Sequence, residues 1–116
     1  TVAGVPVLCM AGRFHFYEGY SPEEVVFPIR VLKLLGVNTV LISNAAGGVD
    51  PSFKVGDLML ITDHISFATV NPLLGKNEER FGPRFPDMSE PYKKHLLAQA
   101  RHIAQEAGIH LREGVY

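Results

Sequence analysis

Residues 38–48, NTVLISNAAGG, decide the fold of this chain. Residues 38–43 have the composition of a short buried strand, and small residues follow at once. Near-continuous apolar strands are typical of parallel sheets whose two faces are both covered. Ligands of such sheets bind beyond the carboxyl ends of the strands. The stretch therefore predicts both a parallel α/β sheet and a ligand site at residues 44–48.

Similar elements lie on both sides of this stretch. Apolar runs at residues 5–10 and 55–65, and a last run that begins near His110, predict three more strands. Amphipathic patterns over residues 21–36 and 89–107 predict two helices. The first has a capping box from Ser21 to Glu24 and is predicted to end at Gly36. The order predicts an α/β fold with a mixed, largely parallel sheet and flanking helices.

Composition limits the possible functions. The chain has 116 residues, is 47% hydrophobic and has a net charge of −1, which suits a globular domain with no general attraction for nucleic acid or anionic membranes. No apolar run approaches the ~18 residues of a transmembrane helix. The single cysteine, Cys9, excludes an intrachain disulfide, so we expect a buried thiol and a cytoplasmic protein.

The ends of the sequence predict a segment rather than a whole protein. The chain begins at Thr1 without an initiator methionine and stops at Tyr116, just inside the last predicted strand. We therefore expect residues 1–116 to be the central segment of a single α/β domain that extends beyond both ends.

The stretch GRFHFYEGY, residues 12–20, follows the first predicted strand. If it is extended, Arg13, His15 and Tyr17 share one face, and Phe14 and Phe16 share the other. This stretch and NAAGG both follow strands of one predicted parallel sheet, so their polar groups are expected at one shared site.

The chemistry of these two stretches favours an anion as the ligand. The backbone of Ala45 to Gly48 is uncrowded, so its N–H groups can approach a phosphate closely. Arg13 offers a planar fork for phosphate oxygens and His15 a second donor. The alternatives are a simple tight turn and a solvated strand face. Neither the Walker loop nor the GxGxxG dinucleotide pattern is present, which counts against a dinucleotide-binding oxidoreductase.

The stretch ERFGPRFPDMS, residues 79–89, places Phe81 and Phe85 in a loop. Such aromatics either anchor a subunit interface or pin the loop to its own domain, and the sequence leaves both open. The spacing of His64, His95 and His102 does not predict a metal site.

Together these motifs resemble the low-molecular-mass, trimeric purine nucleoside phosphorylases. The matching stretches are GRFHFYEGY, then residues 27–65 with NAAGG, then NPL and ERFGPRFPDMS, which together cover nearly the whole chain. The resemblance implies a phosphorylase/nucleosidase-type three-layer fold. It also implies reversible phosphorolysis of purine ribonucleosides such as inosine and guanosine to the free base and ribose 1-phosphate, by a homotrimer without a cofactor.

The resemblance also implies roles for particular residues. By the family pattern, Arg13, His15 and the backbone of Ala45 hold phosphate, which is a co-substrate, and Tyr17 bonds a ribose hydroxyl. Asn44, Ala46 and Gly47 form part of the purine pocket wall. Phe85 is the aromatic that reaches into a neighbouring subunit's site.

The chain also departs from the family pattern. The family's Gly-Ser-Gly phosphate turn, a second phosphate loop and the residues that read the purine are absent from residues 1–116, so we expect this segment alone to be inactive. Two alternatives stay open: a xanthosine-type nucleoside phosphorylase, and a non-catalytic nucleotide- or phosphate-binding module.

Overall fold

The computed structural model describes all residues from Thr1 to Tyr116. The chain forms two compact units. The first contains Thr1–Val40 and Thr69–Arg84, and the second contains Leu41–Ala68 and Phe85–Tyr116. Neither unit has a helix that is long and apolar enough to cross a membrane.

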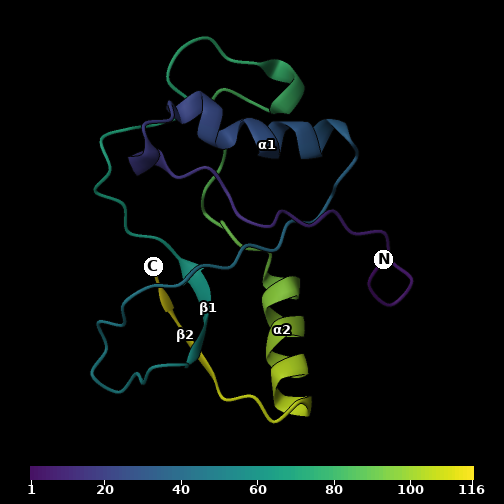
Figure 1. Cartoon of the computed structure of the whole chain (residues 1–116), viewed down its shortest axis with the longest axis vertical. Helices are drawn as coiled ribbons and strands as arrows, with labels where there is room; N and C mark the ends of the chain where they lie inside the picture. The colour runs from purple at the N-terminus through teal and green to yellow at the C-terminus, as the bar shows by residue number, and fades with distance from the viewer. The chain divides into compact units, whose positions relative to one another are not determined.

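The first unit is built around helix α1, Pro22–Leu34, with two short 3-10 helices, η1 at Phe16–Glu18 and η2 at Glu79–Phe81 (Figure 1). The predicted capping box is confirmed. The Ser21 hydroxyl accepts the Glu24 N–H at 3.3 Å, and the Glu24 carboxylate accepts the Ser21 N–H at 2.8 Å. These bonds satisfy donors that the first turn of a helix leaves unpaired.

Helix α1 ends at the predicted glycine. Gly36 has a φ of 83°, a left-handed conformation that glycine adopts without steric cost. Its N–H donates to the Lys33 carbonyl at 3.1 Å, and the next N–H, of Val37, donates to the Leu32 carbonyl at 3.0 Å. This pair of bonds is the Schellman arrangement, which explains why the helix stops here.

The second unit contains a parallel sheet of two strands, β1 at Leu58–Asp63 and β2 at Leu111–Val115, with helix α2, Lys94–Glu106, between them in sequence (Figure 1). The register pairs Leu58 with Leu111 and Met59 with Arg112. Both strands lie within or next to the predicted apolar runs, and the α/β class with parallel pairing is confirmed.

Two predicted strands are wrong for this chain. Residues 5–10 and 38–43 form no strand, and the first run takes part only in an isolated bridge between Val2 and Val5. A strand needs a neighbour that pairs with its N–H and C=O groups, and neither run has one among these residues. Their apolar side chains are accordingly exposed, with Leu41 93% exposed and Ile42 68%.

The second helix starts later than predicted. The sequence predicts a start at residue 89, but α2 begins at Lys94. The Ser89 hydroxyl bonds Asp87 at 2.6 Å and caps no helix, and Glu90 accepts the Lys94 N–H at 2.9 Å. Pro91 disfavours helical geometry at Glu90, the residue before it, which explains why the helix does not begin at residue 89.

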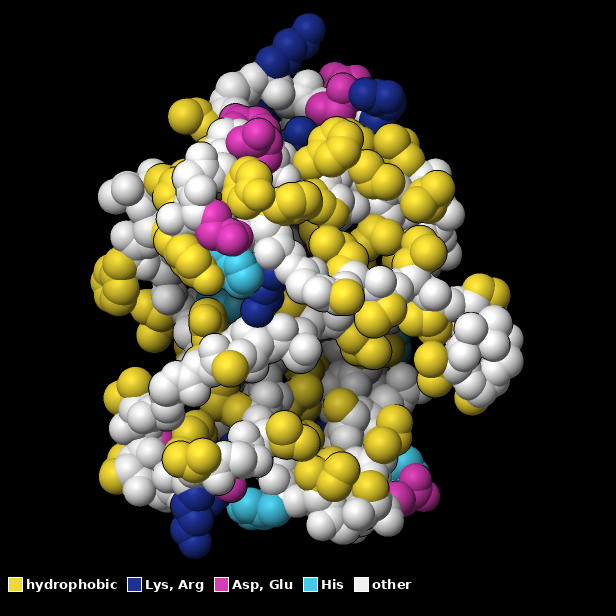
Figure 2. Space-filling model, viewed as in Figure 1, with side chains coloured by type: hydrophobic (Ala, Val, Ile, Leu, Met, Phe, Trp, Pro, Cys, Tyr) yellow, Lys and Arg dark blue, Asp and Glu magenta, His cyan; other side chains and the backbone are white.

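The chain buries very little of its apolar surface. Ala104 is the buried residue of the chain, at 7% exposure, and α2 contacts β1. Elsewhere many apolar side chains reach the surface, as the hydrophobic atoms spread over the face in Figure 2 show. Cys9, predicted to be buried, is exposed as well, because the run around it packs in no sheet.

Candidate functional site

The segment GRFHFYEGY begins extended and then turns, so its predicted alternation is wrong beyond His15. Residues Phe16–Glu18 form η1, and Phe16 is 53% exposed. The turn forms because the Glu18 carboxylate accepts the His15 N–H at 3.0 Å and because Gly19, at a φ of 95°, ends the helix. These two local contacts outweigh the strand pattern.

The turn nevertheless keeps His15 and Tyr17 together. Their rings stack with centroids 5.0 Å apart, and Tyr17 is 84% exposed. His15 Nδ1 lies 3.1 Å from Glu18 Oε2, which leaves Nε2 without a partner in the chain. The His15 N–H, followed by the His15 side chain, lowers the pKa of Glu18, so the carboxylate stays charged at neutral pH. The contact between His15 and Glu18 could have been predicted from their spacing of three residues.

Arg13 is exposed, and its guanidinium has no hydrogen bond or ion pair within the chain. An arginine with all its donors available can bind a phosphate or carboxylate through two parallel hydrogen bonds. Arg13, His15 and Tyr17 all lie in the first unit, within five residues of sequence.

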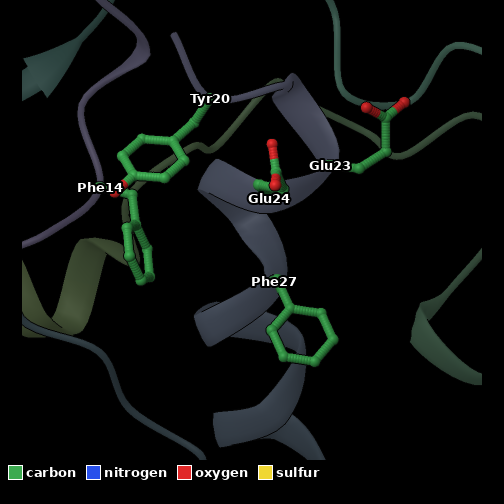
Figure 3. A pocket seen from close by; sticks show the side chains of 5 residues that line it. All are labelled: Phe14, Tyr20, Glu23, Glu24 and Phe27. Carbon is green, nitrogen blue, oxygen red and sulfur yellow. The ribbon is translucent and has the colours of Figure 1, made fainter. Parts of the chain in front are cut away.

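One pocket is lined in part by Phe14 and Tyr20 of this segment, but not by its predicted site residues. It has a volume of about 280 Å³ and is lined by Phe14, Tyr20, Glu23, Glu24 and Phe27. Phe14 and Tyr20 meet edge to face at 5.0 Å, and Phe27 projects from α1, while Glu23 points away from the rings (Figure 3). Its walls are largely apolar, and neither Arg13, His15 nor Tyr17 lines it, so it offers no anion site.

The NAAGG stretch is an exposed loop in the second unit. The backbone N–H groups from Asn44 to Gly48 donate to no group of the chain, by hydrogen bonds to backbone or to side chains. Backbone donors are normally paired, so a run of unpaired N–H groups is available to a ligand or to water. This availability is the feature that the predicted phosphate role of Ala45 requires.

The two aromatics of residues 79–89 differ in their surroundings. Phe81 is half-buried in the first unit, with the guanidinium carbon of Arg30 on α1 at 5.6 Å from its ring centre and that of Arg80 at 5.7 Å. Phe81 therefore pins the loop to its own unit. Phe85 lies in the second unit and is 87% exposed.

A cluster that the sequence did not predict lies where the two strands end. His64 follows β1 and Tyr116 follows β2, and the His64 ring stacks on Tyr92 at 5.5 Å and meets Tyr116 edge to face at 5.7 Å. His64 Nε2 is hydrogen-bonded to the Tyr92 hydroxyl. The pairing of the strands brings His64 and Tyr116 together, and Tyr92 comes from the segment before α2. No group of three or more His, Cys, Asp or Glu side chains could hold a metal ion.

The family of the chain follows from a match over its entire length. The family model described as "Phosphorylase superfamily" matches residues 1–116. The chain belongs to the phosphorylase superfamily.

Relatives within this superfamily are similar along the whole chain. Purine nucleoside phosphorylase 1 of Bacillus subtilis is 57% identical over 116 residues, which are 100% of this chain and 43% of the relative. Purine nucleoside phosphorylase of Rattus norvegicus is 50% identical over 118 residues, covering 97% of this chain and 41% of the relative. The chain thus spans about two fifths of the length of these phosphorylases.

Solved structures of the superfamily share the fold. Schistosoma mansoni purine nucleoside phosphorylase in complex with adenosine aligns with a TM-score of 0.85 and 47% identity, over 90% of this chain and 39% of that one. A purine nucleoside phosphorylase in complex with ribose 1-phosphate gives the same score and identity over 41% of its chain. This likeness confirms the predicted fold family.

The predicted site residues of this superfamily chain fall in both units. Arg13, His15 and Tyr17 belong to the first. The second contains the loop with Ala45 as well as Phe85. A site that joins these two sets therefore remains a prediction from the sequence, as do the individual roles of its residues.

Proposed function

We propose that the full-length protein catalyses the reversible phosphorolysis of purine ribonucleosides, such as inosine and guanosine, to free base and ribose 1-phosphate. The observation that carries this proposal is the identity of 57% with a purine nucleoside phosphorylase over every residue of the chain. Inorganic phosphate is the second substrate, and the reaction needs no cofactor. The proposed assembly is a homotrimer, and the proposed location is the cytoplasm.

In the proposed reaction, a phosphate oxygen attacks the anomeric carbon of the ribose while the bond from that carbon to the purine nitrogen breaks. The electron pair of the broken bond leaves with the base, so the sugar passes through a cationic, oxocarbenium-like transition state. A phosphate held in line stabilises that cation and forms the new bond.

The residues of this chain would hold the phosphate and the sugar. Arg13 has its donors available, and with Nδ1 turned to Glu18, His15 has Nε2 left for a phosphate oxygen. The unpaired N–H of Ala45 adds a backbone donor. Arginine stays protonated at any working pH, so Arg13 positions phosphate and transfers no proton.

Other residues would surround the nucleoside. The exposed hydroxyl of Tyr17 would bond a ribose hydroxyl, while Asn44, Ala46 and Gly47 would form part of the purine wall. The exposed Phe85 would cover the sugar and base in a neighbouring subunit. Excluding water there favours transfer to phosphate over hydrolysis.

The test is phosphorolysis of inosine by the full-length protein, followed by chromatography of hypoxanthine. Arg13→Ala should raise the KM for phosphate by about 10- to 100-fold, as expected when hydrogen bonds to a charged group are lost, and should change the KM for inosine far less. Lys33→Ala removes an exposed positive charge from the same unit and is the matched control.

The outcomes separate the alternatives. An Arg13→Ala enzyme with the phosphate dependence of the wild type would contradict the site. Activity on xanthosine but not on inosine would indicate the xanthosine-type enzyme. Calorimetric binding of phosphate and nucleoside by the full-length protein, without any product formed, would indicate the non-catalytic module.

A further inference from the structure

The loop after NAAGG supports the backbone of NAAGG directly. A Cβ atom placed on Gly48 would lie 3.1 Å from Cδ2 and 3.2 Å from Cβ of Phe53. Such distances are closer than an ordinary van der Waals contact, so the Phe53 side chain rests against the Gly48 backbone. Gly48 is needed here for close approach, since its φ is not positive.

Phe53 is in turn held by an arginine from the far end of the chain. Arg112 on β2 donates from Nε to Asp57 Oδ2 at 2.9 Å and from Nη2 to the Ser52 carbonyl at 3.0 Å. Its guanidinium carbon lies 5.6 Å from the centre of the Phe53 ring. One planar side chain thus contacts three residues of the loop, a geometry that the fork of arginine allows and lysine does not.

The ion pair between Arg112 and Asp57 is the least solvent-exposed one in the chain. The side chains of Arg112 and Asp57 are 24% and 22% exposed, whereas the members of every other ion pair are at least 38% exposed. Shelter from solvent reduces screening and makes a pair more effective at fixing geometry than the usual surface pair.

The loop is also folded on itself around Arg112. The Asp50 carboxylate accepts the Ser52 N–H at 2.8 Å, and the Asp57 carboxylate accepts the Lys54 N–H at 3.1 Å. The bond from the Lys54 N–H, followed by that from Arg112, lowers the pKa of Asp57. The loop at residues 50–57 is therefore linked by its own hydrogen bonds, and Arg112 joins it to the sheet.

We propose that Arg112 is a positioning residue for the anion-binding loop at residues 44–48, acting through Phe53 and Gly48. The N–H groups of residues 44–48 gain no orientation from hydrogen bonds within the chain, so the packing of Phe53 against Gly48 is the contact that restricts this loop. Donors that are fixed before binding hold an anion at a lower entropic cost. The inference rests on the proposed function, because phosphate is the anion that this loop would hold.

The test compares two arginine variants of the full-length protein. Arg112→Met removes the support and keeps an apolar stem of similar length. Arg101→Met is the matched control, since Arg101 forms a bidentate ion pair with Glu113 of the same strand, at 2.6 and 2.8 Å, but has no hydrogen bond to the loop. We expect Arg112→Met to raise the KM for phosphate about ten- to hundredfold, with the inosine KM and kcat changed much less. Arg101→Met should leave all three near the wild-type values.

A second measurement does not depend on activity. The N–H groups of Phe53 and Asp57 are bonded inside the loop, to the Asp50 and Lys54 carbonyls, at 3.0 Å each. Their hydrogen exchange in the ligand-free full-length protein should be faster in Arg112→Met and unchanged in Arg101→Met. If Arg112→Met does not fold, Phe53→Leu is the second variant. It removes the ring that contacts both Arg112 and Gly48, and it should give the same selective rise in the KM for phosphate.

Failure of the proposed function and failure of the role of Arg112 would give different results in these measurements. If the wild-type protein catalyses no phosphorolysis, the proposed function is wrong. The hydrogen-exchange rates of the Phe53 and Asp57 N–H groups then test by themselves whether Arg112 holds the loop. An active wild type with equal phosphate KM values and equal exchange rates in the two arginine variants overturns the role of Arg112. So does an Arg112→Met variant in which only kcat falls.

Discussion

The segment that contains Arg13 and His15 and the loop that follows NAAGG are held in place differently. In residues 13–24 the contacts are local, with His15 on Glu18 and Ser21 on Glu24, each pair three residues apart. In the loop at residues 50–57 the decisive contacts come from Arg112, 55 residues beyond Asp57 and 60 beyond Ser52. The first segment therefore depends on its own sequence, while the second depends on the parallel sheet that presents Arg112.

This difference has a physical consequence for stability. A local contact closes a short loop and costs little chain entropy, whereas a contact across 55 residues forms only together with the rest of its unit. Disrupting the packing of the second unit should release the loop at residues 50–57 and leave residues 13–24 as they are.

The largest expected effect comes from overpacking the core of the second unit. Ala104 on α2 is buried, and Ala104→Leu should lower the free energy of unfolding by about 1–3 kcal/mol. Ala98→Leu, at an exposed position of the same helix, should change it by no more than about 0.5 kcal/mol. Urea unfolding of the full-length proteins measures both. Exchange of the amides at residues 53–57 should accelerate in Ala104→Leu, and equal acceleration at residues 18–25 would break the comparison.

A smaller effect is expected from the local cap. Ser21→Ala removes the hydroxyl that accepts the Glu24 N–H and should lower the free energy of unfolding by about 1 kcal/mol. Ser89→Ala is the control, because the Ser89 hydroxyl bonds Asp87 and caps no helix. Thermal unfolding of the two variants should separate them. Equal losses of stability in the two variants would mean that the Ser21 hydroxyl does not stabilise α1 specifically.

The smallest expected effect is on the pKa values of two carboxylates, Glu18 and Asp57. Contacts in the folded state lower the pKa of Glu18 below 4.5, chiefly through the His15 N–H, and the pKa of Asp57 below 3.8, chiefly through the Lys54 N–H and then Arg112. Because the charged form is favoured on folding, each contributes stability at neutral pH that is lost as the pH falls through its lowered pKa.

Carbon-13 NMR titration of the side-chain carboxyls tests this contrast between local and distant partners. In Arg112→Met the pKa of Asp57 should rise, yet stay below 3.8, since the Lys54 N–H bond remains. The pKa of Glu18 should not move in the same variant, because His15 is its local partner. A shift of Glu18 equal to that of Asp57 would contradict the separation of the two segments.

Prediction from the sequence worked where the signal was local. The capping box at Ser21 and the termination at Gly36 were predicted residue by residue, because caps depend only on near neighbours. It failed at residues 5–10 and 38–43, where an apolar pattern favours a strand but a partner strand decides whether one forms. It also failed at Phe16, where the Glu18 side chain and Gly19 turn the chain.

The sequence by itself determined the family, the α/β class, the helix caps and the residue types suited to phosphate, since motifs and short-range spacing carry that information. Only the tertiary structure decided that β1 pairs with β2 and that His64 meets Tyr92 and Tyr116. It also decided that Arg112 fastens the loop behind NAAGG. These contacts join residues 28 to 60 positions apart, and no local pattern specifies which distant partners a folded sheet will bring together.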